Sequence, residues 1–95
     1  MTKPIKNLQL FSDLCAVEET LVDLGWCKNT SQASDGSVCL MAAASLACED
    51  HKHADDVAGA LSAVMGCDPV RFNDDPSTTF DDVLGKLREA REALL

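Results

Sequence analysis

The segment from Cys48 to His53, with the sequence CEDHKH, gathers the most chemically versatile side chains of this 95-residue chain. It holds a thiol, two carboxylates and two imidazoles. Cys48 and His51 are separated by two residues, which is a spacing that metal sites use. Two further thiols flank a predicted turn and could approach this segment. The weak candidate metal ligands are therefore Cys27, Cys39, Cys48, His51 and His53.

The same segment also fits a polar connection between two helices, with Cys48 on an apolar helix face. Structural zinc sites nearly always contain two cysteines separated by two residues, and no such pair occurs in the chain. A cysteine nucleophile needs a thiolate with an imidazole within reach, and no flanking motif supports one. We therefore expect no metal, no cofactor and no catalytic residue. A small metal-dependent or thiol enzyme remains the alternative.

A second polar segment, VRFNDDPSTTFDDVL, spans residues 70–84. Its aspartates lack the alternating spacing of a calcium-binding loop. Pro76 disfavours helix immediately before it, so Asn73 and Asp74 are expected in a tight loop, bonded to nearby backbone amides. The following helix is expected to take Ser77 or Thr78 as its N-cap and Asp81 or Asp82 as the partner in a capping box.

Acidic residues dominate the charge of the chain, whose formal net charge is −8. Such a surface repels the phosphates of nucleic acids and of anionic membranes, so neither is expected as a partner, whereas a basic protein is. Rows of carboxylates could instead imitate DNA, but Lys86, Arg88 and Arg91 dilute them. The predicted partner-binding face comprises Glu49, Asp50, Asp55, Asp56, Asp68, Asp74 and Asp75.

Trp26 directly follows Gly25, which is expected to end the first helix. A lone tryptophan at a helix end typically closes the core while its indole N–H finds an acceptor. The alternative is a partner-binding hot spot, so Trp26 is also a candidate for the interface.

The elements that must position these residues are mainly helical. Apolar residues recur at steps of four and three from Leu10 to Leu24, which predicts an amphipathic helix that ends at Gly25. Asp35-Gly36 predicts a tight turn, within either a short β-hairpin or an irregular loop. The segment SVCLMAAASLACED predicts a buried central helix that is apolar all round.

Two more helices are predicted in the second half of the chain. The segment ADDVAGALSAVMG has helical periodicity, with Asp55 and Asp56 placed in its first turn, where the helix dipole favours them. The last helix presents Phe80, Val83, Leu84, Leu87, Ala90 and Leu94 as its buried stripe. We therefore expect a mainly α single domain over residues 1–95, built as a bundle of about four helices, with residues 1–7 as a flexible arm.

Hydropathy and cysteine content suggest where the protein acts. The first 14 residues lack the continuous apolar core of a signal peptide, and the longest apolar run is too short for a bilayer. Five cysteines are an odd number for a chain without an export signal, so free thiols are expected. The sequence predicts a cytoplasmic protein that is a monomer or a homodimer.

The order of several short motifs resembles a family of small actinobacterial and actinobacteriophage proteins of unknown function. The chain has a helix ending in Gly-Trp, then a Cys-Leu helix start, then an Asn-Asp-x-Pro loop before a Thr-x-x-Asp-Val helix. It departs from the family at Met41-Ala42, where Leu-Gly is frequent, and at Phe72, where Trp is common. The matching positions are Gly25, Trp26, Cys39, Leu40, Ala43, Asn73, Asp74, Pro76, Thr79, Asp82 and Val83.

The resemblance implies a bacteriophage or actinobacterial accessory protein and brings no assigned reaction. Gly25, Cys39, Asn73 and Pro76 are interpreted as structural positions of the motif. Together with the acidic surface, the resemblance predicts a non-enzymatic protein that acts by binding a host protein, in the host cytoplasm if a phage encodes it.

Overall fold

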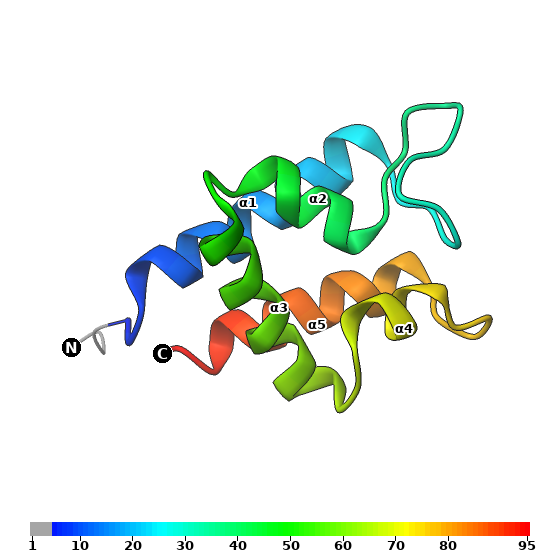
Figure 1. Cartoon of the computed structure of the whole chain (residues 1–95). Helices are drawn as coiled ribbons and strands as arrows, with labels where there is room; N and C mark the ends of the chain where they lie inside the picture. The colour runs from blue at the N-terminus through cyan, green and yellow to red at the C-terminus, as the bar shows by residue number, and fades with distance from the viewer. Residues whose placement is uncertain (1–4) are drawn as a thin grey trace.

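A computed structural model describes residues 5–95 as five α-helices that share one core (Figure 1). The mainly α-helical class expected from the sequence is confirmed, but the expected number of helices is one too low. The helices are α1 (Leu8–Leu24), α2 (Leu40–Ala47), α3 (His51–Met65), α4 (Pro69–Asp74) and α5 (Phe80–Glu92).

The helices α1 and α2 lie side by side, and α3 crosses from them toward α4 and α5 (Figure 1). Helix α1 contacts α2, α3 and α5, and α3 contacts all four other helices. The largest fully buried side chains are leucine and valine from α1, α2, α3, α5 and the loop before α2, together with Asn73 from α4. None of the helices in residues 5–95 is both long and apolar enough to cross a bilayer.

The first helix follows its predicted apolar stripe closely. Leu14, Val17 and Leu21 are fully buried, whereas Leu24, at the end of the stripe, is 44% exposed. Asn7 caps the helix by accepting a hydrogen bond from the backbone N–H of Leu10. The predicted flexible arm is only partly described, because residues 1–4 lie outside the described part of the chain. Within the arm, the backbone N–H of Lys6 donates to the carbonyl of Leu94 at 2.8 Å.

The connection from α1 to α2 is an irregular loop and not a β-hairpin. Gly25 ends α1 at a φ of +90°, a conformation that favours glycine. Val38 forms isolated bridges with Trp26 and with Gln32, but no strand pair extends from them. The predicted turn at Asp35-Gly36 is present, since the carboxylate of Asp35 accepts hydrogen bonds from the backbone and hydroxyl of Ser37.

Helix α2 corrects one prediction, because it is not buried all round. Leu40, Ala43 and Ala44 face the core, but Leu46 is 64% exposed. Its N-cap is Cys39, whose Sγ accepts a hydrogen bond from the backbone N–H of Ala42 at 3.4 Å. The alanines allow α1 and α2 to pack closely on the buried side only.

Helix α3 begins earlier than the sequence predicted. Asp50 is the N-cap and its carboxylate accepts from the backbone N–H of His53, so the segment expected to be a connecting loop forms the first turn. Asp55 and Asp56 consequently lie in the second turn and not in the first. Their predicted role as charges at the helix start is therefore wrong.

Helix α4 occupies the region expected to be a loop. Asp68 caps it and Pro69 occupies the first turn, where a missing N–H leaves no hydrogen bond unmade. Asn73 and Asp74 thus lie at the end of a short helix. Pro76 follows in a turn closed by a hydrogen bond from the Thr78 N–H to the Asp75 carbonyl.

Helix α5 begins with a complete capping box, but its N-cap is Thr79 and not Ser77 or Thr78. The Thr79 hydroxyl accepts from the Asp82 N–H, and the Asp82 carboxylate accepts from the Thr79 N–H. Val83, Leu87 and Ala90 of the predicted stripe are buried.

Candidate functional site

The clearest chemical irregularity in the structure is a buried carboxylate between α1 and α3. Asp13 lies on α1 and is only 7% exposed. Its Oδ1 accepts a hydrogen bond from Gln9 Nε2 at 3.0 Å, whereas Oδ2 is shielded from solvent and has no hydrogen-bond partner among the described residues. Buried polar atoms nearly always have a partner, so this atom requires an explanation.

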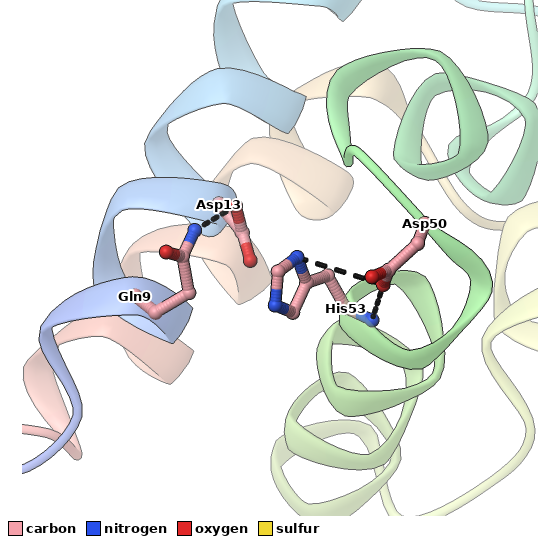
Figure 2. Close-up of polar contacts among 4 residues, drawn as sticks. All are labelled: Gln9, Asp13, Asp50 and His53. Atoms are coloured by element: carbon pink, nitrogen blue, oxygen red, sulfur yellow. Dashed lines mark hydrogen bonds and ion pairs between the residues drawn. The ribbon is translucent and has the colours of Figure 1, made fainter.

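The imidazole of His53 faces Asp13 from α3 (Figure 2). His53 Nδ1 is also shielded from solvent and lacks a hydrogen-bond partner in residues 5–95. It lies 3.6 Å from Asp50 Oδ1, which is within ion-pair range but too far for a good hydrogen bond. Two side chains that face each other from α1 and α3 therefore each have a shielded polar atom without a hydrogen bond, and no hydrogen bond or ion pair joins them.

The charges of this site act on the neighbouring thiol. Burial raises the pKa of Cys48 above its usual value, and the negative charges of Asp13 and Asp50 raise it further. The opposite holds for Asp50, whose pKa is lowered chiefly by the hydrogen bond from the backbone N–H of His53. The site keeps its thiol protonated, which disfavours Cys48 as a nucleophile, because the thiolate is the reactive species.

The five candidate metal ligands are dispersed over the fold. Cys27 lies in the loop after α1, where its thiol is close to the carbonyls of Thr30 and Ser37. Cys39 and Cys48 cap opposite ends of α2, and all five cysteines are free. Across residues 5–95, no three side chains of His, Cys, Asp or Glu are grouped so that they could hold a metal ion.

The predicted motif residues meet in a second polar site, centred on Asn73. This side chain is 1% exposed and makes four hydrogen bonds. Its Oδ1 accepts from Trp26 Nε1 at 2.6 Å and from the backbone N–H of Leu40 at 3.0 Å. Its Nδ2 donates to the Cys27 carbonyl and to Asp74 Oδ1. Asn73 therefore joins the loop after α1, the start of α2 and the end of α4.

The ring of Trp26 makes two further contacts in addition to the hydrogen bond of its indole N–H. Its ring stacks on Phe80 with centroids 5.9 Å apart, and Lys28 Nζ lies 5.4 Å from the ring centroid. Lys28 also donates to the carbonyls of Asp75 and Pro76. These contacts account for Trp26 without any partner protein.

Four members of the predicted acidic face are occupied with local structure. Asp50 and Asp68 cap helices α3 and α4. Asp74 accepts from the backbone N–H of Asn29, and this bond is the main cause that lowers the pKa of Asp74. Asp75 accepts from the hydroxyl and backbone N–H of Ser77, which lower its pKa in that order.

The remaining three acidic residues, Glu49, Asp55 and Asp56, have no such role. All three are exposed, and their carboxylates accept no hydrogen bond and form no ion pair with another residue of the described part. Asp55 and Asp56 lie beside a groove of about 450 Å³ formed by α1, α3 and α5. Glu49 lies apart from them, at a smaller hollow near the end of α2.

Sequence reasoning missed Asp13 as a site residue, although its position carries a signal. Asp13 lies three residues after Leu10 and four before Val17, so helical spacing alone puts it on the buried face. His53 similarly lies four residues before the buried Val57. A charged residue in register with an apolar stripe is a detectable sign of a buried polar site.

Comparison with known proteins identifies a family but no characterised relative. Neither the curated proteins nor the solved structures include a match to the chain. Residues 12–93 match a family model described as a family of unknown function, DUF6197, and this range includes all five helices apart from the first turn of α1. The chain therefore belongs to the DUF6197 family of unknown function.

Proposed function

We propose that the chain is a non-enzymatic accessory protein that acts by binding another protein with a basic surface. The observation that carries this proposal is the pair Asp55 and Asp56. They are exposed in the second turn of α3, bond to no other described side chain, and are not explained by a helix start. Exposed carboxylates without a local partner are suited to attract a cationic surface.

The partner is proposed to be a host protein in the cytoplasm, with the chain encoded by an actinobacterial phage. The order of the Gly-Trp, Cys-Leu and Asn-Asp-x-Pro motifs supports this origin. The raised pKa of Cys48, caused chiefly by burial, disfavours this one thiol as a nucleophile.

Charge reversal on α3 tests the proposal. The double variant Asp55→Lys, Asp56→Lys should capture less of the partner from actinobacterial lysate and should associate with it more slowly. Long-range attraction acts mainly on association, and salt screens it beyond about 8 Å at physiological ionic strength. Wild-type association should therefore slow as salt rises, while dissociation changes little.

A matched control separates the position of the charges from the net charge. Glu19→Lys, Asp23→Lys changes the net charge equally, on exposed positions of α1. This control should retain most of the wild-type association rate. Equal loss in both double variants, or association that does not depend on salt, contradicts a binding site on α3. Asp74 and Asp75 are unsuitable for this test because their carboxylates accept hydrogen bonds from the backbone N–H groups of Asn29 and Ser77.

A further inference from the structure

The residues that line the groove beside Asp55 and Asp56 restrict which kind of partner can bind there. Its residues come from the start of α1, one face of α3 and the end of α5. Small and apolar side chains predominate, and the two aspartates are its charged members. Its small and apolar lining includes Leu10, Gly59, Ala60, Ala63, Ala93 and Leu94.

The α3 side of the groove is a continuous helical face. Asp55, Gly59 and Ala63 follow one another at intervals of four residues, so they lie in successive turns. Gly59 leaves the floor of the groove open, because a Cβ built at this position would meet no atom within 4 Å. The face is acidic toward the start of the helix and small and apolar toward its end.

The cationic side chains of the neighbouring helix are engaged elsewhere. Lys86 Nζ lies 3.1 Å from the Val64 carbonyl and 3.2 Å from Glu89 Oε2. Arg91 Nη1 donates to Glu18 Oε1 on α1 at 2.9 Å. Within residues 5–95, no lysine or arginine lines the groove, and Lys52, one turn before Asp55 and Asp56 on α3, lies outside its lining.

We infer that this groove is the docking site for an amphipathic helix of a cationic partner protein, an inference that rests on the proposed function. Such a helix would place small apolar side chains over Gly59 and Ala63 and a lysine or arginine beside Asp55 and Asp56. Helices pack closely where side chains are small, and amphipathic helices bind grooves through apolar residues spaced three and four apart. A second copy of this chain fits poorly, because it would bring a surface of net charge −8 against another of the same sign.

The test uses a fluorescent synthetic peptide of 18 residues composed of leucine, alanine and lysine, with one apolar helical face. A peptide of the same composition in scrambled order is the control for charge alone. Binding to the full chain is measured by fluorescence anisotropy. The amphipathic peptide should bind wild type at least ten-fold more tightly than the scrambled peptide does.

Two glycines provide a matched pair of variants. Gly59→Leu fills the groove, whereas Gly85→Leu places the same side chain on α5, outside the groove. Both positions are helical and have open space around the added Cβ, so both variants should fold and melt at or above the wild-type temperature. Gly59→Leu should weaken peptide binding at least ten-fold, and Gly85→Leu less than two-fold. Ala63→Gln, also in the groove and exposed, replaces Gly59→Leu if that variant misfolds.

Four results would overturn the inference. Equal binding of the peptide to both glycine variants, or equal binding of the two peptides to wild type, excludes the groove as a helix site. A wild-type dimer in light scattering that Gly59→Leu converts to monomer identifies a second copy as the occupant. Capture of a lysate partner that depends on Asp55 and Asp56 but not on Gly59 leaves the proposed function standing and removes only this inference.

Discussion

Replacing Asp13 with asparagine should stabilise the protein, although most substitutions of buried residues destabilise. In wild type, Asp13 Oδ2 and His53 Nδ1 are both buried without a hydrogen bond, and the two side chains face each other (Figure 2). The asparagine oxygen can keep the hydrogen bond from Gln9. Its amide nitrogen takes the place of Oδ2 and can donate to His53 Nδ1 after a small movement of the two side chains, which form no hydrogen bond or ion pair with each other in wild type.

The size of the gain follows from the groups that become satisfied. One new hydrogen bond contributes about 0.5–1.5 kcal/mol net, and relieving an unsatisfied buried polar atom contributes about 1–3 kcal/mol. Because the relaxed amide will not have ideal geometry, we expect Asp13→Asn to raise the free energy of unfolding by about 1–3 kcal/mol. For a domain of this size that corresponds to a rise of at least about 4 °C in Tm.

Urea denaturation at pH 8 measures the effect. A second measurement in a His53→Leu background shows whether the gain depends on the imidazole, because the coupling between neighbours appears only in a double-mutant cycle. The gain should largely vanish there. If Asp13→Asn instead destabilises wild type by 1 kcal/mol or more, the carboxylate itself stabilises the folded state, and the predicted gain is refuted.

Three further predictions address the other polar residues. Asn73→Ala should lower the free energy of unfolding by about 3 kcal/mol in urea, because the Trp26 indole and Leu40 backbone N–H groups both lose their acceptor; a loss below 1 kcal/mol would contradict the central role of Asn73. Cys48 should be the last thiol to react with an alkylating reagent at pH 8, because its folded pKa is raised above the usual 9.0. For the same reason the free energy of unfolding should fall as pH rises past 9 in wild type, and it should fall less in Cys48→Ala. Asp74 has a folded pKa below the usual 3.8, so its carboxylate stabilises the fold above pH 3.8, and this stabilisation is lost as pH falls through the folded pKa. The difference in unfolding free energy between wild type and Asp74→Asn should therefore shrink in acid. A difference that is constant from pH 7 to 3 would contradict the Asn29 bond as its source.

The helical class and the long helices were predictable because their apolar periodicity coincides with real burial. Leu14, Val17 and Leu21 are spaced as a helix requires and lie fully inside. The helix ends at Gly25 and Gly66 were also predictable from the sequence, since each glycine adopts a positive φ where α1 or α3 stops. Local pattern and tertiary packing agree at these positions, so the sequence alone suffices.

The errors occurred where short polar segments have more than one good local solution. The six residues of α4 are too few to show periodicity, and Pro69 with Asp68 also resembles a loop. Asp50 looked like part of a polar connection, but it is an N-cap, which extended α3 by three residues and moved Asp55 and Asp56 out of its first turn. Only the tertiary contacts of these segments decide between the alternatives.

The candidate site was less predictable than the fold because it depends on pairs distant in sequence. Asp13 and His53 are separated by forty residues, and Asn73 meets the Trp26 indole across a similar interval. The acidic face was predicted only from the high density of acidic residues along the sequence. That density does not distinguish a helix-capping carboxylate such as that of Asp68 from a carboxylate without a hydrogen bond such as that of Asp55.

The two irregular features of the fold are neighbours on the same pair of helices. Asp13 lies one turn from Leu10 on α1, and His53 lies one turn from Asp56 on α3, while Leu10 and Asp56 both line the groove. The facing side chains of Asp13 and His53 therefore lie between α1 and α3, close to the edge of the groove. Selection for stability alone would favour the loss of an unsatisfied buried carboxylate. If α1 and α3 must move apart at this edge of the groove to admit a partner helix, weak packing between them there is an advantage. Peptide affinity in Asp13→Asn distinguishes the two cases: unchanged affinity makes Asp13 a local defect, and weakened affinity with raised stability links it to the groove.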